Sequence, residues 1–147
     1  MGRALWGEAP RESITRASAR YGSHVVVAAC VDLLHDRPVT ADLVRVLGGP
    51  RADLTADRPA TAYWLRVWAL RGLLWNWDEV AGPEVCDALA DPQWRVREMA
   101  ARVVARHAIG DALPGIAALR MDPHPRVRAV AVRALARLTA ADQSTER

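Results

Sequence analysis

The stretch DPQWRVREMAARVVARH, residues 91–107, returns in altered form as DPHPRVRAVAVRALARL, residues 122–138. The two stretches are offset by 31 residues, and the same offset backwards reaches WLRVWALRGLLWN, residues 64–76. Such self-similarity predicts a repeat protein. The pairs that match between the first two stretches are Asp91 with Asp122, Pro92 with Pro123, Val96 with Val127, Arg97 with Arg128, Ala100 with Ala131, and Arg102 with Arg133.

Each repeat combines a short helix with a longer one. The segments between the long stretches also match, with Pro83 paired to Pro114. Asp91 and Asp122 supply side-chain acceptors for free N–H groups at a helix start, and a following proline fits a first turn that needs no donor. The sequence therefore predicts helical hairpins that stack on one another.

The apolar residues of the long stretches favour helix over strand. On a helical wheel Val96, Ala100, Val103 and Val104 form one face, which should pack on neighbouring helices. Upstream, residues 9–22, 23–34 and 40–49 read as helices, the last with a glycine stop, whereas residues 49–60 read as a loop. We expect an all-α solenoid of about four hairpins in one domain, 1–147, with irregular hairpins over 9–60, regular repeats over 61–138 and a polar tail over 139–147.

Composition describes an ordinary globular chain with an uneven charge. The chain has 147 residues and a net charge of +3, and all its 20 basic residues are Arg, which hints at a GC-rich bacterial genome. Residues 91–138 carry the positive excess, whereas residues 61–90 are slightly acidic. Neither a signal peptide nor a membrane span is apparent, so we expect a cytoplasmic protein without a membrane partner. Cys30 and Cys86 lie in apolar surroundings and read as buried free thiols.

The combination of a proline in the short helix, an aspartate, a Val-Arg pair soon after it and an Ala-rich helix resembles the HEAT-repeat family. Its short period is similar to the compact HEAT-like repeats of phycobilin lyases and of many bacterial proteins. The resemblance implies a hydrogen-bonded ladder between successive repeats, made by Asp91, Arg97, Asp122 and Arg128. The earlier unit keeps Arg66 but has Ala60 where the aspartate belongs. The family implies a scaffold or binding role by default.

No catalytic constellation is apparent. The chain has no nucleophile elbow, phosphate-binding loop or paired zinc histidines, and its four His are scattered. His107 reads as a core residue and His124 as a solvated one, while Asp78 and Glu79 read as the cap of a short helix. The sequence predicts no catalytic residue, no metal site and no cofactor.

The strongest surface signal is a stripe of six arginines on the polar side of the two long helices. We call Arg95, Arg102, Arg106, Arg126, Arg133 and Arg137 the arginine stripe. The corresponding columns of the earlier unit hold Trp64, Arg71 and Trp75, with Trp68 beside them. Arg and Trp are both frequent at protein-binding hot spots, and both also serve phosphate binding and base stacking. Glu98 can pair with Arg102 four residues later, but its counterpart in the next repeat is Ala129.

The sequence predicts a non-enzymatic scaffold that binds an unidentified protein partner through its long helices. The alternative is a nucleic-acid-binding module that resembles the HEAT-like alkylpurine DNA glycosylases in its basic surface with aromatic side chains. A phycobilin-lyase-like handling of a tetrapyrrole is a third reading, which rests on the short repeat length. An all-structural reading of the stripe and the Trp cluster, as helix-surface and buried packing, also remains open.

Overall fold

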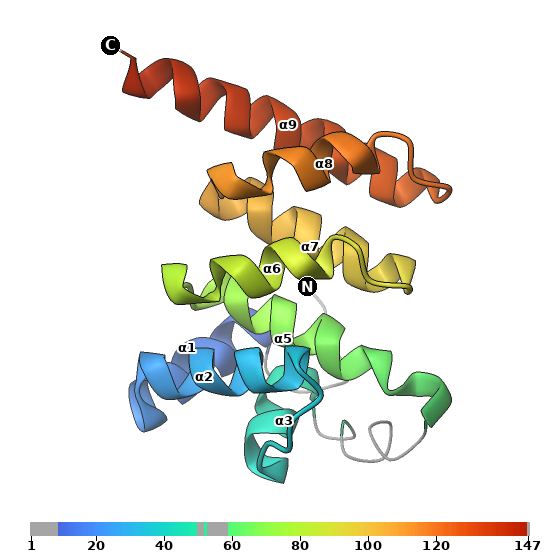
Figure 1. Ribbon diagram of the computed structural model, residues 1–147. Coiled ribbons are helices and arrows are strands. Elements are labelled where there is room, and N and C mark those ends of the chain that lie inside the picture. The colour runs from blue at the N-terminus through green and yellow to red at the C-terminus, as the bar shows by residue number, and fades with distance from the viewer. Residues whose placement is uncertain (1–8, 50–51, 53–58, 147) are drawn as a thin grey trace. The chain divides into compact units, whose positions relative to one another are not determined.

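The computed structural model of the chain describes residues 9–49, 52 and 59–146 (Figure 1). Every regular element within these ranges is a helix, which confirms the all-α class. The chain divides into two compact units, Met1–Ala81 and Gly82–Arg147. Each unit is described by itself, and the prediction of one solenoid domain over 1–147 stays a prediction.

The first unit contains four α-helices in the part that the structure describes. They are α1 (Pro10–Tyr21), α2 (Ser23–Leu34), α3 (Ala41–Gly48) and α5 (Tyr63–Trp75), and two short 3₁₀ turns, η1 (Pro59–Thr61) and η2 (Glu79–Ala81), lie beside α5 in sequence. Helix α3 ends before Gly49, whose φ of 97° favours glycine. The helices predicted over 9–22, 23–34, 40–49 and 64–76 are thus confirmed, whereas most of the loop predicted over 49–60, like residues 1–8 of the N-terminus, lies outside the described residues.

The core of this unit forms where α2 and α3 pack against α5. Ile14, Cys30, Leu47 and Leu70 are all completely buried there. Two glycines allow the close approach of the helices. A Cβ atom added at Gly72 would lie 2.6 Å from the Cys30 Sγ, and one added at Gly48 would lie 2.5 Å from the Trp68 ring.

The second unit consists of two helical hairpins in the same register. The first pairs α6 (Gly82–Ala88) with α7 (Trp94–His107), and the second pairs α8 (Leu113–Leu119) with α9 (Pro125–Thr145), after a 3₁₀ turn, η3 (Gly110–Ala112). Within each hairpin the two helices pack together, and α7 packs along α9 (Figure 1). This stacking of hairpins is the repeat pattern of an α-solenoid.

The apolar face predicted for the long helices is confirmed. Val96, Ala100, Val103 and Val104 of α7 are fully buried. In α9 the matching positions Val127 and Ala131 are fully buried as well. Small and β-branched side chains at these positions let the helices of successive hairpins lie close together.

The long helices begin later than the sequence analysis predicts. The Asp91 Oδ1 accepts the Gln93 N–H at 2.9 Å, and the Asp122 Oδ1 accepts the His124 N–H at 2.9 Å. Each aspartate therefore caps a tight turn that precedes the helix, and the N-cap residues are Gln93 and His124. The reason is that an Asx turn competes with helix for the same backbone donors.

Helix α9 continues past Leu138 to Thr145, so it includes most of the segment 139–147 that the sequence predicts as a polar tail. Ala140, Ala141 and Gln143 are good helix formers, so nothing in the segment breaks the helix. The Thr139 hydroxyl donates to the Leu135 carbonyl at 2.8 Å, and further hydroxyl groups near the end donate in the same way. The polar residues thus lie on a helix, of which 139–145 is the last part.

Candidate interaction site

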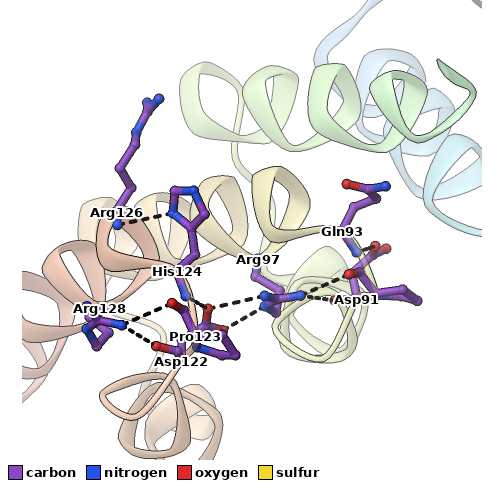
Figure 2. Close-up of polar contacts among 9 residues, drawn as sticks. Asp91, Gln93, Arg97, Asp122, Pro123, His124, Arg126 and Arg128 are labelled. Atoms are coloured by element: carbon purple, nitrogen blue, oxygen red, sulfur yellow. Dashed lines mark hydrogen bonds and ion pairs between the residues drawn. The ribbon is translucent and has the colours of Figure 1, made fainter.

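An arginine of the first hairpin joins the two hairpins of the second unit. The Arg97 Nε donates to the Asp122 Oδ2 at 2.7 Å, and its Nη2 donates to the Oδ1 at 3.2 Å. Its Nη1 donates to the Asp91 and Pro92 carbonyls at 2.8 and 3.1 Å (Figure 2). One guanidinium therefore holds the loop of its own hairpin and the carboxylate of the next. This is the inter-repeat contact that the HEAT resemblance implies.

The environment of Asp122 favours its charged form. Burial by itself would raise the pKa of Asp122, whose side chain is only 4% exposed. The hydrogen bond from Arg97, the backbone N–H of His124 and the charges of these two residues outweigh burial and lower the pKa. The carboxylate is thus ionised in the folded chain at neutral pH, where a bidentate arginine pair is strongest.

Arg128 repeats half of this arrangement. Its Nη1 donates to the Asp122 carbonyl at 2.7 Å and to the Pro123 carbonyl at 3.2 Å, as Arg97 does one repeat earlier (Figure 2). Its Nε and Nη2 make no hydrogen bond or ion pair with any residue that the structure describes. The side chain is exposed.

The starts of α7 and α9 meet through an aromatic stack that the sequence analysis missed. The Trp94 and His124 rings lie 3.7 Å apart between centroids and are nearly parallel, at 8°. The His124 Nδ1 accepts the Arg126 N–H at 3.2 Å and so caps α9. His124 is thus only partly exposed, and not fully solvated as expected, because its Nδ1 atom and one ring face are engaged. The available signal was the position of both residues at the starts of successive long helices, one residue out of the 31-residue register.

The Glu98 carboxylate forms ion pairs with two arginines of the stripe, Arg102 and Arg126. Its Oε1 lies 3.1 Å from the Arg102 Nη2 and accepts a hydrogen bond of 3.2 Å from the Arg126 Nε, while its side chain is almost buried. The pairing with Arg102 confirms the spacing argument. The partner for Arg126 was missed because it comes from α7, the long helix of the preceding hairpin, rather than from α9 itself.

The rest of the arginine stripe differs in how much it is engaged. The Arg95 guanidinium lies 4.5 Å from the centroid of the Trp94 ring, and that of Arg126 lies 5.4 Å from it. Arg106, Arg133 and Arg137 are exposed. Arg133 and Arg137 make no hydrogen bond or ion pair with the described residues. The stripe thus has an engaged end near the helix starts and solvated members farther along α9.

The tryptophans that the sequence analysis placed beside the arginine stripe differ in exposure. Trp64 and Trp75 are partly exposed, and Arg11 covers the Trp75 ring at 5.3 Å. Trp68 is buried against Gly48. Arg71 donates from its Nη2 to the Leu47 carbonyl at the end of α3, and burial lowers its pKa. The expected place of Trp68 on a binding surface is therefore corrected, because α3, which lies outside the regular repeats, covers it. Arg71 is partly exposed, and its place on a binding surface stays a prediction.

The structure also places the two cysteines and Arg66, which the sequence analysis named. Cys30 is buried and free, as predicted, and burial raises its pKa to about 12, whereas Cys86 is partly exposed. Arg66 lies 3.5 Å from Asp36 within the first unit. Across residues 9–49, 52 and 59–146, His, Cys, Asp and Glu form no group of three or more that could hold a metal ion. None of the helices described is both long and apolar enough to cross a membrane.

Comparison with known proteins identifies the repeat. The family model described as HEAT repeats matches residues 61–146, which is more than half of the chain. No curated protein and no solved structure matches the chain. The match covers both hairpins of the second unit, in which the Arg97–Asp122 pair lies, and also includes α5.

Proposed function

The chain belongs to the HEAT-repeat family, and from this we propose that it is a non-enzymatic cytoplasmic scaffold that binds a partner protein through the surface of α7 and α9. HEAT repeats are commonly protein-interaction scaffolds, because stacked hairpins present extended surfaces. The observation that carries the proposal is the cluster at the helix starts, where a partly exposed Trp94 is surrounded by arginine side chains.

This cluster has the composition of a protein-binding hot spot. Trp and Arg are enriched at such spots, and a rigid aromatic ring loses little conformational entropy on binding. The Trp94–His124 stack and the pairing of Glu98 with Arg102 and Arg126 hold the side chains in one arrangement before any partner arrives. Preorganisation of this kind strengthens binding by reducing the entropy lost.

The same contacts favour a protein partner over nucleic acid. Base stacking requires a free aromatic face, but the Trp94 ring is stacked on His124 and lies close to two guanidinium groups. Arg102 and Arg126 share the carboxylate of Glu98, which weakens their attraction for phosphate. Nucleic acid is retained as the alternative because Arg133 and Arg137 are exposed and carry no ion pair with the described residues.

The test uses the full chain and charge reversal at positions without structural contacts. The variant Arg133→Glu with Arg137→Glu removes the solvated end of the stripe. The control is Arg37→Glu with Arg45→Glu, which reverses two exposed arginines of the first unit and also breaks their exposed ion pairs with Asp32 and Asp42, so it is at least as disruptive as the stripe variant. Proteins captured from the source cell are quantified by mass spectrometry. We expect a specific protein that the wild type and the control retain and that the stripe variant loses.

A second measurement separates the two partner classes. Fluorescence anisotropy follows labelled random duplex DNA against the wild-type chain across a salt series. The proposal expects no binding near physiological salt. Binding whose logarithmic affinity falls steeply with the logarithm of salt, and which the stripe variant loses, would replace the protein partner with nucleic acid.

A further inference from the structure

The backbone of the α8–α9 hairpin repeats that of the α6–α7 hairpin position by position. The N–H groups of Leu89 and Asp91 donate to the carbonyls of Cys86 and Ala88, and those of Arg120 and Asp122 donate to the carbonyls of Ala117 and Leu119. The first turns of α7 and α9 match in the same way. Each residue over 113–138 therefore has a counterpart 31 positions earlier, in the first hairpin, whose surroundings are known.

The face that α6–α7 turns toward α8–α9 is covered, whereas the same face of α8–α9 is open among the described residues. Ala101 is 0% exposed, but its counterpart Val132 is 56% exposed. Leu89 is buried and would contact a Cβ atom at Gly115 of α8, but its counterpart Arg120 is exposed. Because the two backbones agree, the difference in exposure arises from packing: the α8–α9 hairpin covers this face of α6–α7, and no described residues cover the same face of α8–α9.

We call this open face of the second hairpin the trailing face; it consists of Arg120, Arg128, Ala129 and Val132. Its charge differs from that of the covered face. Leu89 is replaced by Arg120, and the acidic Glu98 is replaced by Ala129. One positive charge is gained and one negative charge is lost, so an apolar and neutral neighbour is a poor fit and an acidic one is a good fit.

Arg128 gives the trailing face a defined binding position. The guanidinium of Arg97 is anchored by two loop carbonyls through its Nη1 and binds the Asp122 carboxylate through its Nε and Nη2. Arg128 has the equivalent two anchors, to the Asp122 and Pro123 carbonyls, and its Nε and Nη2 have no partner among the described residues. The planar fork is thus held in place with its carboxylate-binding edge empty.

We propose that the trailing face binds an acidic segment of a partner protein, one carboxylate of which accepts two hydrogen bonds from the Nε and Nη2 of Arg128. Val132 supplies apolar contact beside it, and Arg120 supplies a second positive charge. Arg128 and Arg120 lie outside the arginine stripe. If the stripe variant kept its partner, the proposed function of the stripe would fail, but the proposal for the trailing face would not be affected.

The test measures binding of a short fluorescent peptide of alternating Asp and Ala to the full chain. Two variants change the site in different ways. Arg128→Gln removes the guanidinium fork, and Ala129→Glu keeps Arg128 with its anchors but restores the acid that Glu98 provides one repeat earlier. The control Ala140→Glu adds the same charge on an exposed position of α9, about three helical turns away.

We expect the peptide to bind the wild type and to shift the Arg128 Nε–Hε cross-peak in the NMR spectrum. Each of the two site variants should raise the Kd about tenfold, as the loss of a charge-assisted pair predicts, and the control should change it by less than about threefold. An unshifted Arg128 cross-peak, or equal Kd values for all four proteins, would overturn the proposal. So would duplex DNA that shifts this cross-peak while the peptide does not, since phosphate would then be the ligand.

Discussion

The Asp122 carboxylate links the loop before α9 to the preceding hairpin, and its energetic weight is open to direct measurement. It accepts hydrogen bonds from Arg97 and from the His124 backbone, and its side chain is almost wholly buried. We expect Asp122→Asn to lower the free energy of unfolding at pH 7 by about 2 kcal/mol, because the charge-assisted bonds weaken. Urea denaturation measures this loss. Asp111→Asn, at an exposed site, should cost less than about 0.5 kcal/mol.

The cost of Asp122→Asn should depend on pH. The pKa of Asp122 is lower in the folded chain than the value of about 3.9 for an unfolded aspartate. The ionised group therefore stabilises the fold fully above about pH 4, and this contribution is lost as the pH falls through the folded pKa. The difference between wild type and variant should shrink below about pH 4. A difference that stays constant into strong acid would contradict the role given to the charge.

The two cysteines should react very differently with a thiol reagent. Thiolate is the reactive form, and burial raises the pKa of Cys30 to about 12 while excluding reagent. The pKa of Cys86 is raised by its partial burial and by the charges of Asp111 and Asp87, but its side chain is partly exposed. We expect native protein to be labelled at Cys86 alone, faster as pH rises, and at Cys30 only on unfolding. Mass spectrometry of labelled peptides decides this, and labelling of native Cys86→Ser protein would refute it.

Helix packing in the first unit depends on the absence of a side chain at Gly72 of α5. A Cβ atom there would lie 2.6 Å from the Cys30 Sγ of α2 and 2.7 Å from the Leu47 Cδ2 of α3. We expect Gly72→Ala to destabilise the chain by about 1–3 kcal/mol, despite the better helix propensity of alanine, because the helices must move apart. Thermal unfolding would show it as a lower Tm.

Gly82 in α6 provides the matched control for this substitution. A Cβ atom at Gly82 would meet nothing within 4 Å. Gly82→Ala should therefore leave stability unchanged or raise it by a few tenths of a kcal/mol through helix propensity. If both glycine variants lowered the Tm equally, the loss would come from backbone conformation and the packing argument for Gly72 would fail.

Stability along a repeat protein is carried by contacts between neighbouring hairpins, and Arg97 makes such a contact in the second unit. We expect Arg97→Gln to increase amide hydrogen exchange in α8 and α9, because the loop before α9 loses its anchor to the preceding hairpin. Exchange in α1 and α2 should stay unchanged. Arg137→Gln, at an exposed position of α9 without an ion pair to the described residues, is the control. Exchange that rises equally in all helices would instead indicate one cooperative unfolding unit.

The sequence by itself determined the all-α class and the 31-residue register, whereas the pairing of Arg97 with the next Asp-Pro turn was implied by the resemblance to HEAT repeats. A repeat places each residue beside its counterpart in the following hairpin, so sequence spacing contains most of the neighbour information. The register also located the arginine stripe, but the wheel showed only contacts along one helix and thus found Arg102 for Glu98 without finding Arg126.

Only the tertiary structure decided which of the candidate residues are covered. Arg71 shares its column with the exposed Arg102 and Arg133, yet its guanidinium donates to the Leu47 carbonyl of α3, outside the repeat register. Trp68, which lies beside that column, is buried against Gly48 of the same helix. His124 reads as polar and solvated in sequence, yet a tryptophan from the neighbouring hairpin stacks on it. The burial of a residue depends on segments that are distant in sequence. The 31-residue repeat predicts the packing of the repeated helices, but it cannot predict the packing of a helix such as α3 that is not part of the repeat.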